Sequence, residues 1–422
     1  TYEDVTNVDS VGLITARNGI EIGARPGVAA SISVDGNMII SGITTLGTTS
    51  FAVDATITTG KLGIGFTDNN IKVGSTALDS LTTGTHNTAV GHNALTANTT
   101  GAENTAVGSL ALDANTTGDE NTALGKSSLG SNTTGEYNTA VGKSALFANT
   151  TASYNTAVGK DALLANTTGG QNVAVGAYAL DSNTTASFNT AIGDQSLATN
   201  TTGGYNTAVG QSALFDNTSG AANVALGNSA LANNTTANDN TAVGVAALED
   251  NTTGAGNVAV GRYALANNTT AGNNTAVGYA SLLTNTTGTR NTAVGSGTLD
   301  ANSTGDDNTA FGFEALTSCT TGSDNTALGK DALYTLTTGG HCVAIGKDAL
   351  TANTANDNTA VGSNAAKALS TGTATVAVGR SALLQLTTGN NNTAVGSEAG
   401  HDVTTGGNNI LIGQGAGRST SP

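Results

Sequence analysis

The sequence has very little material for a conventional hydrophobic core. Its 422 residues include no tryptophan, one methionine and two prolines, and aromatic residues make up only 4% of the chain. A chain of this length would ordinarily form two or three globular domains, and each would need bulky side chains in its interior. The composition argues against that arrangement and favours a thin core repeated along one axis.

Positive charge is also scarce. The chain has 14 Lys and Arg residues against 30 Asp and Glu, a net charge of −16. Nucleic acids and anionic membranes both require a basic surface, so we expect neither as a partner. No apolar run approaches the 18 residues of a spanning helix, and the N-terminus does not resemble a signal peptide. Because the chain begins at Thr1, we expect it to be a fragment or a processed product.

What the sequence does contain is a 17-residue repeat, NTAVGxxALxxNTTGxx. Copies begin at residue 70 and every 17 residues up to 342, then at 358, 375, 392 and 409, because one residue is missing before Asn358. These 21 copies, the last incomplete, indicate a solenoid. We predict an all-β, elongated β-solenoid (a β-helix or β-roll) in three regions: a β stalk at 1–69, regular turns at 70–357 and thinner turns at 358–422.

The residue types that exchange at each position of the repeat, here called slots 1 to 17, predict which side chains point inward. Slot 4 is always apolar and slot 2 exchanges Thr with Val or Ile, so we expect both to face the core. Slot 3 is nearly always Ala, which suggests a wall that another wall approaches closely. We expect walls at slots 2–5, 8–9 and 12–15, with solvent-exposed corners at slots 6–7, 10–11 and 16–17.

Slot 12 predicts a buried column of amides. It is usually Asn but becomes Leu81, Leu336, Leu369 and Leu386 elsewhere, so the slot should face inward. Each amide would then bond to the amide of the next turn. Asn-Thr-Thr at this slot is also a glycosylation sequon, which burial would make inaccessible. The expected ladder includes Asn98, Asn115, Asn132, Asn149, Asn166, Asn183 and Asn200.

Residues that could carry chemistry have simpler structural explanations. Cys319 and Cys342 lie two turns apart, about 10 Å along the axis, so we expect free, buried thiols. The pairs Asp119–Glu120 and Asp306–Asp307 fall on corners, where adjacent side chains diverge. The four histidines (His86, His92, His341 and His401) have no metal-ligand spacing. We therefore expect no enzymatic activity, no cofactor and no metal.

Two surface features leave a binding role open. Slot 17 is aromatic at Tyr137, Tyr154, Phe188 and Tyr205, which would form a stripe that contacts either a host glycan or a neighbouring protomer. Threonine-rich solenoids can also bind ice, but that function needs two Thr columns on one face. Consecutive residues such as Thr99 and Thr100 point to opposite sides.

The repeat phrase, together with the closing NNILIGQGAG at 408–417, resembles the repeat arrays of phage tail-fibre proteins. The opening YEDVTNVDSVGLITARNGI is similar to stalk phrases of cyanophage structural proteins, and NTAVG is similar to the repeat of trimeric autotransporter adhesin heads. The resemblance implies a homotrimer that forms the shaft of a tail fibre on the virion. It would hold a tip that binds a host glycan or protein receptor, and its partners would be phage baseplate or tail proteins. The alternatives are a shaft on the bacterial cell surface and an ice-binding solenoid.

Overall fold

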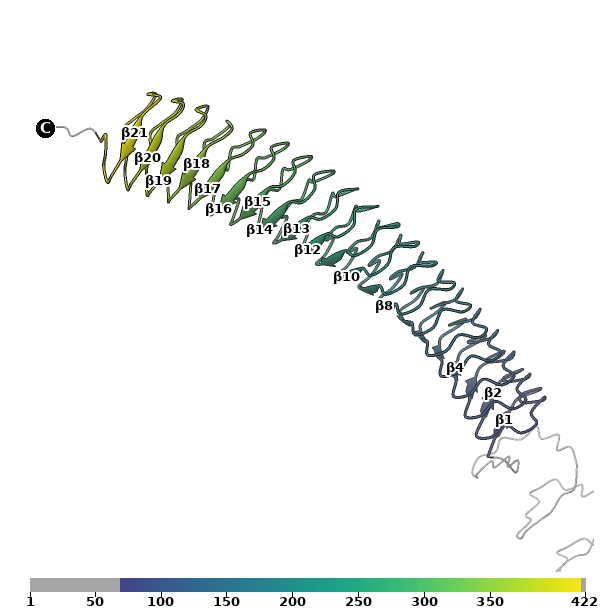
Figure 1. Cartoon of the computed structure of the whole chain (residues 1–422). Helices are drawn as coiled ribbons and strands as arrows, with labels where there is room; N and C mark the ends of the chain where they lie inside the picture. Colours follow the sequence, from purple (N-terminus) through teal and green to yellow (C-terminus); the bar gives the residue numbers. More distant parts are fainter. Residues whose placement is uncertain (1–68, 419–422) are drawn as a thin grey trace, which may run out of the picture. The chain divides into compact units, whose positions relative to one another are not determined.

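The computed structural model describes residues 69–418, which form a parallel β-solenoid of 17-residue turns (Figure 1). The β stalk predicted at 1–69 lies, except for its last residue, outside the described range. Each turn contributes one three-residue strand at slots 2–4. The strands are β1 (Ile71–Val73), β2 (Thr88–Val90), β3 (Thr105–Val107), β4 (Thr122–Leu124), β5 (Thr139–Val141), β6 (Thr156–Val158), β7 (Val173–Val175), β8 (Thr190–Ile192), β9 (Thr207–Val209), β10 (Val224–Leu226), β11 (Thr241–Val243), β12 (Val258–Val260), β13 (Thr275–Val277), β14 (Thr292–Val294), β15 (Thr309–Phe311), β16 (Thr326–Leu328), β17 (Val343–Ile345), β18 (Thr359–Val361), β19 (Val376–Val378), β20 (Thr393–Val395) and β21 (Ile410–Ile412).

The strands form one parallel sheet in which each pairs with the next in chain order. Each strand residue pairs with the residue 17 positions later, which is the period of the sequence: Thr88 pairs with Thr105, and Ala89 with Ala106. Identical slots therefore stack on one another, and each side-chain type forms a column along the axis. This stacking explains why a turn with so small a core is stable only in an array.

The structure reverses the orientation that we predicted for the strand residues. The slot-3 alanines, such as Ala89, are fully buried, whereas slots 2 and 4 on either side of them face outward. Thr and Val exchange at slot 2 because both are β-branched and fit a half-exposed strand, and the exchange therefore does not report burial. The Ala wall lines the interior and is not available to another wall.

The core is one leucine thick in the turns that begin at residues 70 to 342. Leu95 at slot 9 and Ala94 at slot 8 pack with Ala89 at slot 3, and all three are fully buried. Buried asparagines at slots 1 and 12, here Asn87 and Asn98, flank this apolar strip. The interior therefore combines a thin apolar column with two polar ones.

Unusual backbone angles close each turn. Gly91 at slot 5 has a φ of 141°, and a Cβ on it would lie 2.5 Å from the carbonyl oxygen of Gly108, so glycine is required. Non-glycine residues occupy the left-handed region at slots 7, 9 and 17, for example Asn93, Leu95 and Glu103 with φ of 56°, 52° and 59°. Such angles cost free energy in an isolated chain, and here the stacked neighbours hold them in place.

The other two predicted walls are not strands, although they also bond along the axis. Slots 6–11 are turns and slots 13–14 are bends. The Leu95 amide nevertheless donates to the Ala111 carbonyl at 3.0 Å, and the Thr99 amide donates to the Thr116 carbonyl at 2.9 Å. Every side of the solenoid is thus tied to the next turn, while regular strand geometry is confined to slots 2–4.

The missing residue before Asn358 is absorbed in a bend. The turn that begins at Cys342 has 16 residues, yet Val343 still pairs with Thr359 in the sheet. The side-chain amide of Asn353 donates to the Ala355 carbonyl two residues on, where other turns bond three residues on. The shortening therefore falls after slot 12, and the sheet continues in register through the predicted boundary at 357/358.

Candidate functional site: the sheet face and its edges

The outer face of the sheet is an uncharged surface that runs the length of the described solenoid. Its two columns, slots 2 and 4 of β1–β21, consist of Thr, Val, Ile, Leu and one Phe, with no charged residue at either slot. Several of these side chains are well exposed, including Ile71, Leu124, Leu226, Phe311 and Leu328. Exposed apolar patches that extend over many residues mark interaction sites.

The slot-12 asparagines form a continuous ladder beneath the surface. Asn115 donates through Nδ2 to Oδ1 of Asn98 at 2.9 Å and also to the Gly118 carbonyl at 3.0 Å. The same bond between successive amides, 2.8–3.1 Å long, runs without a break from Asn98 to Asn302. All seven residues of the expected ladder belong to it and are fully buried, so a glycan cannot reach this slot.

A second column of amides, at slot 1, was not anticipated as a ladder. Oδ1 of Asn87 accepts the backbone amide of Asn104 at 3.0 Å, and its Nδ2 donates to the Gly101 carbonyl at 2.9 Å. The same carbonyl accepts Nδ2 of Asn98, also at 2.9 Å. The two columns are therefore joined through slot 15. The near-constant Asn at slot 1 was the available signal, and it could have been interpreted in the same way as slot 12.

The aromatic residues of slot 17 stack in two pairs. Tyr137 lies on Tyr154, and Phe188 on Tyr205, each with ring centroids 4.9 Å apart and nearly parallel planes. Within a pair each ring therefore covers one face of the other, which leaves ring edges and the two outer faces exposed. All four rings are well exposed. Sugars stack on ring faces, so the stacking limits the area that this stripe offers to a glycan.

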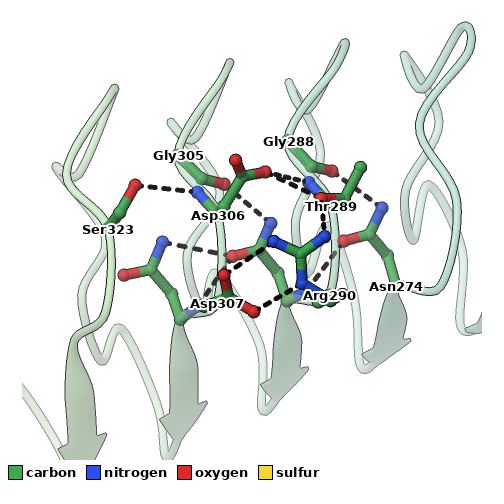
Figure 2. Close-up of polar contacts among 10 residues, drawn as sticks. Asn274, Gly288, Thr289, Arg290, Gly305, Asp306, Asp307 and Ser323 are labelled. Atoms are coloured by element: carbon green, nitrogen blue, oxygen red, sulfur yellow. Dashed lines mark hydrogen bonds and ion pairs between the residues drawn. The ribbon is translucent and has the colours of Figure 1, made fainter.

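The carboxylate pairs are engaged in contacts between turns. Figure 2 shows Asp306 accepting the backbone amide of Thr289 at 2.6 Å and its hydroxyl at 2.9 Å. Asp307 forms a bidentate ion pair with Arg290, and this ion pair lowers the pKa of the Asp307 carboxyl. In the other pair, Asp119 accepts the backbone amide of Ala102 at 2.7 Å. These carboxylates stabilise corners and do not face one another across a cleft.

The remaining candidates also have structural surroundings. Cys319 and Cys342 are free and buried, and burial raises the pKa of Cys319 to about 11. No group of three or more His, Cys, Asp or Glu side chains within residues 69–418 is placed to hold a metal ion. That range also contains no membrane-spanning helix. A shallow hollow near the C-terminal end is lined by Glu314, Asp331, Tyr334, Asp348, Thr351 and Lys367, with Lys367 and Asp348 paired at 3.2 Å.

The site thus consists of the outer face of the sheet, bordered by slot 6 on one edge and by slots 16–17 on the other. Comparison with known proteins gives no match, either among protein-family models or among curated protein sequences.

Proposed function

We propose that this chain is the shaft of a homotrimeric phage tail fibre, which presents a host receptor-binding tip. The observation that supports the proposal best is the unbroken in-register stack from β1 to β21. At roughly 4.8 Å per turn, this stack spans about 100 Å. Its role is mechanical, because many bonds along one axis make a stiff spacer that resists proteolysis.

The sheet face also bears on the ice-binding alternative. Its slot-2 column is rich in Thr, and a regular Thr column on a flat face suits ice. Slot 4, however, varies from Val90 to Leu124 and Phe311, so the height of the surface changes from turn to turn. A protein partner can repack around such variation, whereas a crystal lattice cannot. We therefore favour a structural shaft over an ice-binding surface, and we expect no enzymatic activity.

Immunogold labelling tests where the shaft belongs. An antibody raised against residues 87–302 should decorate fibres on the tails of phage particles, and it should block their adsorption only weakly because it binds the shaft. Labelling of bacterial envelopes in the absence of phage would instead support the adhesin shaft. Purified protein that shapes growing ice crystals, with no labelling of either structure, would overturn both.

A further inference from the structure

The sheet face is accompanied by an asymmetric distribution of charge on its two edges. Slot 6, next to the face on one side, contains most of the cations of the described range and a single acid, Asp194. Slots 16–17, on the other side, contain acids and a single cation, Arg290. The slot-6 cations are Lys126, Lys143, Lys160, Arg262, Lys330, Lys347 and Arg380, and the acids of the opposite edge are Glu103, Asp119, Glu120, Glu136, Asp239, Asp306, Asp307, Asp324 and Asp357.

Several of these charges are already neutralised within the chain. Lys160, Lys330 and Lys347 each lie within 4 Å of the acid that follows them at slot 7, and Arg380 pairs with Glu398. Lys126 and Lys143 differ from these residues, because a serine follows each of them at slot 7 and both lysines are exposed. Neither lysine forms an ion pair within the described chain.

Unpaired acids lie at the same axial levels on the opposite edge. Glu120 precedes β4, the strand that Lys126 follows, and Glu136 is separated by one residue from the turn that contains Lys143. Neither Glu136 nor Glu120 has an ion-pair partner in the described chain, and the Glu120 carboxylate raises the pKa of the neighbouring Tyr137 hydroxyl. The uncharged sheet face separates these lysines from these acids within one chain.

We propose that the sheet face binds a second copy of this chain in parallel orientation, with Lys126 and Lys143 of one copy opposite Glu120 and Glu136 of its neighbour. Burial of slots 2 and 4 drives the association, and the edges select its direction. When two copies pack face to face with parallel axes, rotation about the axis places the basic edge of each against the acidic edge of the other. Antiparallel packing instead brings like edges together, which is unfavourable.

A ring of three copies, with the sheet faces turned toward a central axis, also places each basic edge against the acidic edge of the next copy. The contact between copies is the sheet face and not the Ala wall, because the slot-3 alanines are buried inside the turn. It does not depend on a place in the virion, since a parallel bundle would serve equally well on a cell surface.

The first test measures whether the face holds copies together. Sedimentation of the full chain should show an oligomer, and Leu226→Lys should dissociate it, because Leu226 is exposed in one copy and would be buried between two. Asn267→Lys adds the same charge at an exposed slot-11 corner and should leave the oligomer intact. Circular dichroism should show that both variants are folded. A wild-type chain that stays monomeric at micromolar concentration, or equal behaviour of the two variants, would overturn the proposal.

The second test measures direction. A zero-length carbodiimide cross-linker should produce covalent oligomers in which Lys126 or Lys143 is joined to Glu120 or Glu136. Within one chain these groups lie on opposite edges of the sheet, so such a product must join two copies. The double variant Lys126→Glu/Lys143→Glu should weaken association about tenfold. Adding Glu120→Lys/Glu136→Lys should restore it. Cross-links that join the two ends of the solenoid, or no rescue, would show that the copies are not parallel.

Discussion

At the scale of single residues, the slot-12 ladder shows how a buried polar column is satisfied. Asn200 donates to Oδ1 of Asn183 at 2.9 Å and to the Gly203 carbonyl at 2.9 Å, and its own Oδ1 accepts Nδ2 of Asn217 at 2.8 Å. A side-chain amide supplies the two donors and the acceptor that this arrangement uses, whereas a hydroxyl has only one donor. The column is stable because every member has both kinds of partner.

Asn200→Asp should therefore destabilise the solenoid by about 3–5 kcal/mol at neutral pH, because a buried charge would face two acceptors. The pKa of this carboxyl should be higher in the folded than in the unfolded chain, so stability should rise as the pH falls through the folded value. Asn200→Leu should cost less, about 1–3 kcal/mol, since only the neighbouring amides lose a partner. Thermal unfolding of both variants at pH 4 and pH 7 measures the difference. If Asp is tolerated as well as Leu at neutral pH, the slot is not buried.

At the scale of one turn, the strand and the bends tolerate change differently. The turn that begins at Cys342 has one residue fewer than the others, and the missing residue falls in the bend after slot 12, where side-chain hydrogen bonds can be rearranged. The pairing of Val343 with Thr359 is kept. Loss of a residue inside a strand would instead exchange inward and outward side chains, because successive strand residues point to opposite faces.

Deletion of Thr202, at slot 14, should therefore be tolerated with a loss of about 1–2 kcal/mol, the scale of one or two backbone hydrogen bonds. Deletion of Ala208, the slot-3 residue of β9, should abolish a stable turn, because Val209 would be directed into the space of a buried alanine. Chemical denaturation and limited proteolysis of the two deletion variants compare these costs. Equal resistance would show that strand register is not what limits the turn.

At the scale of the whole molecule, each turn contacts only its neighbours, so stability is a sum over turns and interfaces. Solution scattering of the full chain should indicate a rod with a length of at least about 100 Å. The Leu226→Lys variant is the matched comparison, because separation of copies should reduce the cross-section and leave the length unchanged. A compact particle of equal dimensions would contradict the solenoid.

The sequence by itself determined the period, the number of turns and the burial of the slot-12 asparagines. A strict repeat makes equal slots stack, and the exchange of Asn98 with Leu336, Leu369 and Leu386 predicts an interior position, where all four residues are fully buried. These inferences follow because residues at the same slot of different copies must fit the same structural environment. The free state of Cys319 and Cys342 follows from the same stacking.

Only the tertiary structure decided which way the strand residues point and how the corners are used. An exchange of Thr with Val fits both a buried and a half-exposed strand, so composition at slot 2 could not distinguish them. Leucine at slot 9 adopts a left-handed backbone that its own preferences oppose, and the stacking of neighbouring turns imposes it. The outward Thr/Val face and the two charged edges beside it follow from these turns, because side-chain direction depends on backbone angles that residue types alone do not specify.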